Sequence, residues 1–372
     1  MTNDERTTTR YALMMAGGSG TRLWPMSRAE LPKQLIPFIA GRSLLALALD
    51  RFEGLIPADR QYVCAGRQHR EAVLSAVPAL RPAQFLGEPV GRDTLAAVGF
   101  PAAVLAKKDP EAVVGVFAAD HLIEPVDQFQ RIIVQGFTLA ERQPHTLVTF
   151  GITPTGPATG YGYLELGEPI DGEARIVKQF REKPPLATAE EYVRQGPQRY
   201  LWNSGMFVWR AATLLDCIRR YQPAVWEGLM AVAAAWDTPR QEEVLDQVYP
   251  TLQKTSVDYA VMEPASRDPA VCVAAIPMAL KWLDVGSWPS FAQTCPTDEH
   301  GNALAAGRHL LHETAGCLVA STDPEHLIAA IGCRDLVIIH TPDATLICPT
   351  EMAEKIKEVF NLVQARFGGR HA

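Results

Sequence analysis

The feature that most constrains this chain is a short apolar run followed at once by a glycine-rich segment. Residues 11–15 (YALMM) have the composition of a buried strand, and the segment after them, residues 16–34 (AGGSGTRLWPMSRAELPKQ), is here called the signature loop. Gly17, Gly18 and Gly20 permit a tight turn whose backbone N–H groups can surround an anion. Arg22 and Lys33 add two cations. Together these features predict a site for the phosphates of a nucleoside triphosphate.

Two common phosphate-binding motifs do not fit the signature loop. No Gly-Lys-Ser/Thr follows the glycines, which excludes a P-loop, and Leu23 stands where a dinucleotide fingerprint requires its third glycine. A glycine turn after a strand can also be plain turn chemistry. A ligand-binding loop is favoured by the additional residues at fixed spacings, which are Arg22, Pro25, Pro32, Lys33 and Gln34.

Strands and helices are expected to alternate along the first third of the chain. The apolar spacing predicts strands over 61–64, 84–86 and 113–118, and helices over 43–52, 68–76 and 93–107. Such alternation is typical of a mostly parallel sheet with helices on both faces, in which ligands bind at the carboxyl ends of the strands. The signature loop and Asp120 both follow strands, so both are expected at that edge.

The rest of the chain is less regular and changes character near residue 290. We expect strands over 147–150, 175–181 and 202–209, and helices over 189–195, 211–221, 226–235 and 241–248. Beyond residue 290, short apolar runs separated by turns indicate a small β module, and the spacing in 351–367 predicts a closing helix. The expected parts are a disordered N-terminus (1–10), a main domain (11–290) and the β module with its helix (291–372).

Composition narrows the classes of function. The 372 residues carry a net charge of −7 with no basic tail, which argues against a nucleic-acid surface. No apolar run approaches the length of a membrane span, and residues 1–10 do not resemble a signal peptide. The seven cysteines form no CxxC pair and are typical of reduced thiols in the cytosol. We therefore expect a cytoplasmic protein that binds neither nucleic acid nor membrane.

Two aspartates are candidates for a divalent metal site. Asp120 follows an apolar strand in FAADH, and Asp284 precedes a glycine in WLDVGSW. Mg²⁺ usually takes one or two carboxylates together with phosphate oxygens and waters, which suits such a pair. In isolation, a turn or helix-capping role is the simpler interpretation of each aspartate, so the prediction requires the fold to bring the two together.

Further polar residues lie in the middle of the chain. Glu182 and Lys183 precede two prolines that keep the chain extended, and they could contact a sugar and its phosphate or form an exposed charge pair. Asn203, in WNSGM, could recognise hydroxyl groups or belong to a turn. Asp258, in SVDY, could cap a helix that runs through Met262 or take part in the site.

A set of motifs occurs in one order along most of the chain: GGSGTRLWPMSRAELPKQ, GEPVGRDTLAA, FAADH, GYGYL, FREKP, WNSGMFVW, SVDYAVME and WLDVGSW. In this order they resemble the sugar nucleotidyltransferases, and among these the mannose-1-phosphate guanylyltransferase (GDP-mannose pyrophosphorylase) family. The resemblance is close over residues 11–290 and looser beyond them. It implies a Rossmann-like (glycosyltransferase-A-like) nucleotidyltransferase domain with a mixed, mostly parallel sheet, then a left-handed parallel β-helix and a C-terminal helix.

The resemblance also implies a reaction, in which GMP passes from GTP to α-D-mannose 1-phosphate to give GDP-mannose and pyrophosphate. Mg²⁺ would be held by Asp120 and Asp284. The catalytic cations would be Arg22, Lys33 and Lys183, and the sugar would contact Gly162, Glu182, Asn203 and Asp258. The nucleotide would be bound by Ala16, Gly17, Gly18, Gly20, Thr21, Glu88, Gly91, Arg92, Asp93, Thr94 and Ala119. Of these, Glu88 or the backbone near Gly91 would accept hydrogen bonds from guanine.

Two departures and two alternatives accompany this interpretation. Asp93 stands where relatives usually carry Asn, and the sequence ends without the phosphomannose isomerase domain of longer relatives, so isomerase activity is not expected. A homodimer is expected. The alternatives are a sibling enzyme for another base or sugar, and a non-catalytic regulator that binds GDP-mannose. The complete set of cations and aspartates argues against the regulator.

Overall fold

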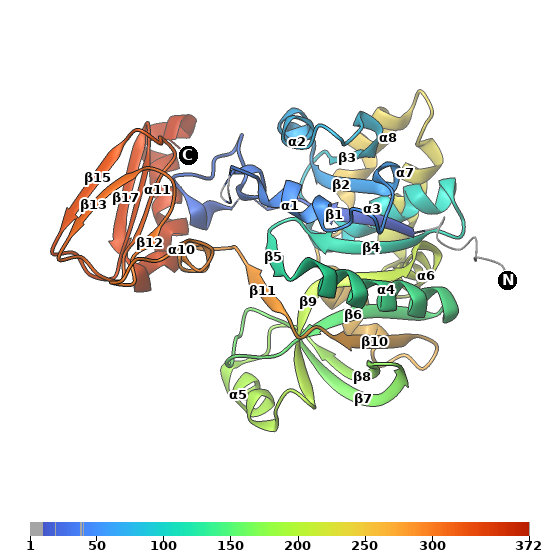
Figure 1. The fold of residues 1–372 in the computed structure, drawn as a ribbon. Helices are drawn as coiled ribbons and strands as arrows, with labels where there is room; N and C mark the ends of the chain where they lie inside the picture. The colour runs from blue at the N-terminus through green and yellow to red at the C-terminus, as the bar shows by residue number, and fades with distance from the viewer. Residues whose placement is uncertain (1–9, 19, 38, 40, 372) are drawn as a thin grey trace.

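The computed structural model describes residues 10–18, 20–37, 39 and 41–371, and its main feature is a nine-stranded sheet (Figure 1). The first part of the sheet is parallel and has the order β3 (Phe85–Glu88), β2 (Gln61–Gly66), β1 (Arg10–Met15) and β4 (Val113–Ala118). The helices α1 (Leu44–Asp50), α2 (Arg70–Ala76) and α3 (Asp93–Lys108) connect these strands. This part has the alternation predicted from the sequence.

The second part of the sheet is mixed. It continues with β9 (Tyr200–Arg210), β6 (Thr146–Ile152), β10 (Cys272–Pro277), β8 (Ala174–Arg181) and β7 (Tyr163–Asp171). Strand β9 is antiparallel to β4, β6 and β7, so it joins the two parts. The helices here are α4 (Val126–Arg142), α5 (Leu186–Gln195), α6 (Ala211–Tyr221), α7 (Pro223–Ala235) and α8 (Gln241–Val248), followed by a π-helical turn (Asp258–Met262) and α9 (Glu263–Ala265).

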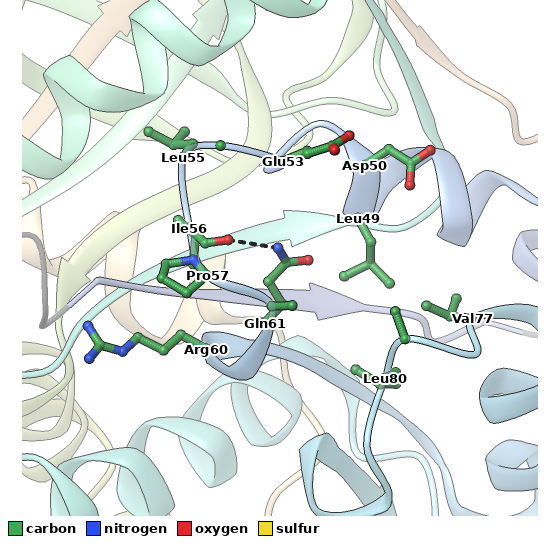
Figure 2. A pocket seen from close by; sticks show the side chains of 13 residues that line it. Leu49, Asp50, Glu53, Leu55, Ile56, Pro57, Arg60, Gln61, Val77 and Leu80 are labelled. Atoms are coloured by element: carbon green, nitrogen blue, oxygen red, sulfur yellow. Dashed lines mark hydrogen bonds between the residues drawn. The ribbon is translucent and has the colours of Figure 1, made fainter.

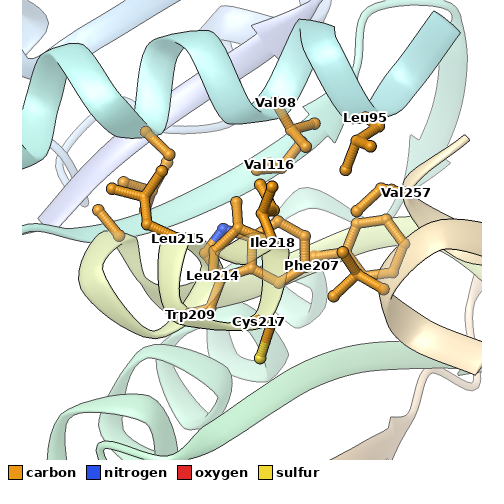
Figure 3. Close-up of a cluster of buried hydrophobic side chains, with 14 of the residues drawn as sticks. Leu95, Val98, Val116, Phe207, Trp209, Leu214, Leu215, Cys217, Ile218 and Val257 are labelled. Carbon is orange, nitrogen blue, oxygen red and sulfur yellow. The ribbon is translucent and has the colours of Figure 1, made fainter. Parts of the chain in front are cut away.

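Both faces of the sheet are buried. On β1, Leu13 packs into one apolar cluster, whereas Ala12 and Met14 pack into another, because successive residues of a strand point to opposite faces. Figure 3 shows part of the first cluster, in which Trp209 and Phe207 of β9 stack with ring centroids 5.0 Å apart. Apolar residues on both faces explain why the strands read as continuous apolar runs in the sequence.

The C-terminal unit is a stack of short strands beside the main sheet (Figure 1). Parallel pairing joins β12 (Ala303–Leu304), β14 (Leu318–Ser321) and β16 (Leu336–Thr341) on one side, and β13 (Arg308–His312) and β15 (Leu327–Ile331) on another. This is the coiled arrangement of a β-helix. The antiparallel strand β17 (Ala344–Pro349), a 3₁₀ segment (Thr350–Lys355) and α11 (Ile356–Phe367) follow.

The C-terminal unit is fastened to the signature loop. Trp24 Nε1 donates a hydrogen bond to His371 O at 2.7 Å, and Trp288 Nε1 donates to Trp24 O at 3.1 Å. Arg28 forms an ion pair with Asp343 at 2.8 Å. Apolar residues of the loop and of the β-helix also share one buried cluster. The end of the chain is therefore held against the segment that was predicted to bind phosphate.

The predicted fold class agrees with this architecture, but several elements of the main domain were not predicted. They include α4, β10 and the short strands β5 (His121–Glu124) and β11 (Lys281–Asp284). The boundary expected near residue 290 falls within α10 (Trp288–Ala292). Of the N-terminus expected to be disordered, only Arg10 lies within the described residues, as the first residue of β1. All seven cysteines are free thiols, and no helix in the described part of the chain could span a membrane.

Candidate active site

Two short strands bring the predicted metal ligands together. Strands β5 and β11 pair with Asp284 opposite His121, and Asp120 directly precedes β5. A hydrogen bond from Ala119 N to Met15 O, at 3.0 Å, holds this segment beside β1. Side-chain ligand atoms of Asp120, His121 and Asp284 lie within 4.8 Å of one another, and no other such group of His, Cys, Asp and Glu occurs among the described residues. The two predicted metal ligands are thus neighbours in space.

The Lys33 ammonium contacts both of these carboxylates. Its Nζ lies 2.6 Å from Asp120 Oδ2 and 3.7 Å from Asp284 Oδ1, and it also donates to Val285 O at 3.4 Å. The lysine side chain is buried. Lys33, which the sequence analysis predicted to bind phosphate, therefore contacts both aspartates that were predicted to bind the metal.

The carboxylates suit a hard divalent cation. Burial raises the pKa of Asp120, but the charges of Lys33 and His121 outweigh burial and hold this pKa below its usual value, so the group is ionised at neutral pH. Asp284 Oδ1 is buried, and none of the described residues donates a hydrogen bond to it. Burial lowers the pKa of His121, whose Nδ1 accepts a hydrogen bond from Trp282 Nε1 at 3.2 Å. Two carboxylates, one of them with an oxygen that accepts no hydrogen bond from the described residues, fit the ligand preference of Mg²⁺.

A cavity of about 480 Å³, here called the loop cavity, opens beside Lys33. At Gly20 the backbone φ is +62°, and a Cβ would lie 2.8 Å from Lys33 Cβ, so the close approach of loop and lysine requires glycine. Ser27 Oγ donates to Gly20 O at 2.7 Å, and Gln34 Nε2 donates to Ala16 O at 2.5 Å. The loop cavity is lined by Gly17, Gly18, Gly20, Thr21, Arg22, Lys33, Asp120, Gly286, Glu354 and Lys357.

A second cavity, of about 250 Å³ and here called the inner cavity, lies on the other side of Asp120 and Asp284, which are here called the acidic pair. Asp284 and His121 line it, whereas Asp120 and Lys33 line the loop cavity, so the carboxylates separate the two spaces. All four residues predicted to contact sugar line the inner cavity, namely Gly162, Glu182, Asn203 and Asp258. The two cavities therefore collect most of the predicted residues around one acidic pair.

Strand β9 is irregular where it borders the inner cavity. Thr149 of β6 is opposite Phe207, but Gly151 is opposite Asn203, so the register shifts and β9 bulges between these pairs. Gly205 lies in the bulge with a φ of +69°. Three successive residues of the bulged part, 203–205, line the cavity. The bulge thus turns a stretch of the sheet into a binding surface.

Three side chains at the inner cavity, those of Thr149, Asn203 and Asp258, are joined by hydrogen bonds. Thr149 Oγ1 donates to Asn203 Oδ1 at 2.8 Å, and Asn203 Nδ2 donates to Asp258 Oδ1 at 2.9 Å. Burial, together with the Glu182 carboxylate, raises the pKa of Asp258 to about 7. Lys183 lines neither cavity, but its ammonium donates a hydrogen bond to Glu182. Burial alone would lower the pKa of Lys183, but the hydrogen bond to Glu182 has the larger effect, so this pKa is raised.

The segment from Glu88 to Thr94 is only partly at the site. Tyr249 OH donates to Glu88 Oε1 at 2.6 Å, both side chains are buried, and burial raises the pKa of Glu88. Thr94 lines the inner cavity, and its Oγ1 accepts a hydrogen bond from Val257 N at 2.9 Å. The other predicted residues of this segment, Gly91, Arg92 and Asp93, line neither cavity.

A larger cavity, of about 780 Å³, lies away from these residues. It is bordered by α1, residues 53–61 and residues 77–80, and Gln61 Nε2 donates to Ile56 O at 2.9 Å within it (Figure 2). Its lining includes apolar side chains such as Leu49, Val77 and Leu80, and none of the residues predicted from the motifs. Chemistry rather than size therefore locates the candidate active site.

Comparison with known proteins agrees with this assignment. The family described as "Nucleotidyl transferase" matches residues 11–301, and the family described as "MannoseP isomerase/GMP-like beta-helix domain" matches residues 307–362. A mannose-1-phosphate guanylyltransferase of Escherichia coli K12 is 35% identical, with 97% of this chain and 74% of that protein covered. This chain belongs to the mannose-1-phosphate guanylyltransferase family.

Other members of the family give the same result. A mannose-1-phosphate guanylyltransferase of Klebsiella pneumoniae is 34% identical over 95% of this chain and 73% of its own length. A crystal structure described as a mannose-1-phosphate geranyltransferase from Thermus thermophilus has a TM-score of 0.83 and 32% identity, and the match covers 96% of this chain and 99% of that one. This guanylyltransferase-family chain is therefore a nucleotidyltransferase, and its predicted fold class is confirmed.

The residues of this family member's site that were not predicted from the sequence include His121, Gly286, Glu354 and Lys357. His121 directly follows the predicted ligand Asp120, so the sequence could have indicated it as a third candidate ligand. At Gly286, a Cβ would lie 3.2 Å from Asp284 Oδ1 and 3.4 Å from an Arg22 guanidinium nitrogen, so glycine leaves space for both groups. The remaining two, Glu354 and Lys357, come from the end of the chain and resemble ordinary exposed helix charges in the sequence.

Proposed function

We propose that this protein transfers GMP from GTP to α-D-mannose 1-phosphate, giving GDP-mannose and pyrophosphate. One observation carries the proposal. A cavity with a glycine-rich wall and cations, and a second cavity lined by amide and carboxylate side chains, meet at the acidic pair Asp120 and Asp284. The curated relatives named as mannose-1-phosphate guanylyltransferases suggest the base and the sugar.

The two cavities suggest where each substrate would bind. The triphosphate would lie in the loop cavity against the backbone of Gly17, Gly18 and Gly20, with Arg22 beside it. The sugar would lie in the inner cavity, where Asn203 and Glu182 offer amide and carboxylate partners for hydroxyl groups. In this arrangement the α-phosphate and the sugar phosphate would approach each other at the acidic pair.

The chemistry then needs position and charge rather than a protein nucleophile. A sugar-phosphate oxygen would attack the α-phosphorus in line; its bond to phosphorus forms while the bond to the bridging oxygen of the β-phosphate breaks, and pyrophosphate leaves. Arg22 and Lys33 would bind the β- and γ-phosphates and the charge that develops on them. Lys183 would hold the sugar phosphate. Mg²⁺ bound by Asp120 and Asp284 would supply further positive charge between the two anions.

The test is a pyrophosphate-release assay with each nucleoside triphosphate against each sugar 1-phosphate, with and without Mg²⁺. We expect rapid release only with GTP and mannose 1-phosphate, and none after chelation of the metal. A hydrogen-bonding pocket can discriminate between bases by up to ~10⁴-fold. Equal use of UTP, ATP or dTTP would point to a sibling enzyme instead. Binding of GDP-mannose without turnover of any pair would point to a regulator.

A further inference from the structure

The C-terminal segment contributes two charged side chains to the loop cavity. Glu354 lies at the end of the 3₁₀ segment and Lys357 in the first turn of α11, and both line the cavity together with the signature loop. Their position is set by contacts on both sides. Trp24 Nε1 donates to His371 O, and the β-helix shares its apolar cluster with residues of the signature loop. The C-terminal segment is therefore a fixed wall of the cavity and not a loose tail beside it.

The cations of the loop cavity differ in what they already contact. Lys33 is held by Asp120 and Asp284. Arg22 forms an ion pair with Glu354, with a guanidinium nitrogen 3.1 Å from Oε2. Lys357 is exposed, and no ion pair or hydrogen bond joins its side chain to any other residue that the structure describes. Lys357 therefore lines the cavity as a cation without a partner among the described residues.

We propose that the C-terminal segment completes the site for the β- and γ-phosphates: Lys357 binds them directly, and Glu354 holds Arg22 until the polyphosphate displaces it. The inference rests on the proposed function, because it assigns the loop cavity to a polyphosphate. A polyanion needs several cations, and the charge of Lys33 is already shared with two carboxylates, so Lys33 alone does not neutralise it. Lys357 and a released Arg22 supply further positive charge from two segments that line the cavity, the C-terminal segment and the signature loop.

Glu354 and Lys357 are expected to act in opposite directions. Removing Lys357 takes away a charge-assisted contact to phosphate, which corresponds to about a tenfold loss of affinity or more. Removing the charge of Glu354 releases Arg22 in advance and removes a carboxylate that repels phosphate. Because Arg22 and Glu354 are exposed, with 44% and 70% of their side chains accessible, the gain should be only about two- to fivefold.

The experiment measures binding of inorganic pyrophosphate and tripolyphosphate to the full-length protein by calorimetry, so it does not depend on turnover or on the identity of the base. Lys357→Met should weaken binding of both probes about tenfold, and Lys357→Arg should restore most of it. Glu354→Gln should tighten binding. Lys355→Met is the matched control, since Lys355 is an exposed lysine of the same segment that does not line the cavity. Its affinity should equal that of the unchanged protein.

Kinetics provide a second readout that distinguishes this inference from the proposed function. With an active enzyme, Lys357→Met should raise KM for the nucleoside triphosphate and leave KM for the sugar phosphate unchanged. Failure of the unchanged protein to release pyrophosphate would refute the proposed function without affecting the binding result. Unaltered affinity of Lys357→Met for both probes, or a weaker affinity of Glu354→Gln, would overturn the inference.

Discussion

Replacing Lys33 with methionine tests the central arrangement of the site. Methionine has a similar length but no charge, so Asp120 and Asp284 would face each other without the ammonium that contacts both at 2.6 and 3.7 Å. Loss of one partner from a fully buried ion pair costs about 3–5 kcal/mol. Because the two aspartate side chains remain 23% and 30% exposed, water screens part of this loss, and we expect ~1–3 kcal/mol of lost stability without metal.

The same substitution should strengthen metal binding and still abolish most of the activity. The ammonium competes with a cation for the two carboxylates, so Mg²⁺ should bind the variant more tightly; a tenfold gain in affinity corresponds to ~1.4 kcal/mol of added stabilisation at saturation. Turnover should fall by ~10²–10³, because the charge beside the reacting phosphates is lost. Saturating Mg²⁺ should restore stability without restoring turnover, since a metal on the carboxylates does not replace the lysine.

Thermal melting with a Mg²⁺ titration, together with pyrophosphate release, measures both effects. Lys108→Met is a matched control, because Lys108 pairs with Asp237 at 3.4 Å at the far end of α3 and contacts neither cavity. Its turnover and its response to Mg²⁺ should be those of the unchanged protein. Equal stabilisation of the Lys33 variant and the unchanged protein by Mg²⁺ would refute the competition, and turnover within about threefold of normal would remove Lys33 from catalysis.

Three further predictions concern the inner cavity and Lys183 beside it. In Gly162→Ala the new Cβ would lie 2.5 Å from Glu182 Oε2, so displacement of Glu182 should raise KM for the sugar phosphate about tenfold and leave KM for GTP unchanged in steady-state kinetics. Lys183→Ala should lower turnover by ~10² and raise the same KM; normal values of both would exclude it from the site. Asp258, with its pKa raised to about 7, binds a proton more tightly in the folded state, so it makes the protein less stable as pH rises from about 4 to 7. Asp258→Asn should therefore be stabilising by ~1–3 kcal/mol in melts at pH 8 and nearly neutral at pH 4, whereas equal shifts at both pH values would contradict a raised pKa.

Local sequence signals explain the parts that were predicted correctly. Neighbouring residues alone determine the apolar run of β1, the glycines after it and the position of Asp120 two residues after the end of β4. The pattern and the structure therefore coincide there. Helix α4 was missed although the signal was present. Phe129, Ile132, Ile133 and Phe137 are buried at helical spacing, and a count of that spacing would have found the helix.

Other features depend on contacts between distant segments and leave no local pattern. Strands β5 and β11 have four residues each, too few to show a period, and their pairing joins Asp120 to Asp284 across most of the main domain. The contact of Lys33 with both carboxylates follows from that pairing. Glu88 was assigned to guanine from its place in a motif, but its hydrogen bond to the buried Tyr249 is set by packing between β3 and the segment after α8.

The bulge in β9 has a consequence for anyone who wishes to engineer this protein. The four steps along β9 from Asn203 to Phe207 are matched by only two along β6, from Thr149 to Gly151. A consensus or computational redesign that favours regular strand pairing would delete the extra residues of β9 and add hydrogen bonds between β9 and β6. It would also remove the bulged backbone of residues 203–205 that lines the proposed sugar site. A variant made more stable in this way should therefore be a less active enzyme.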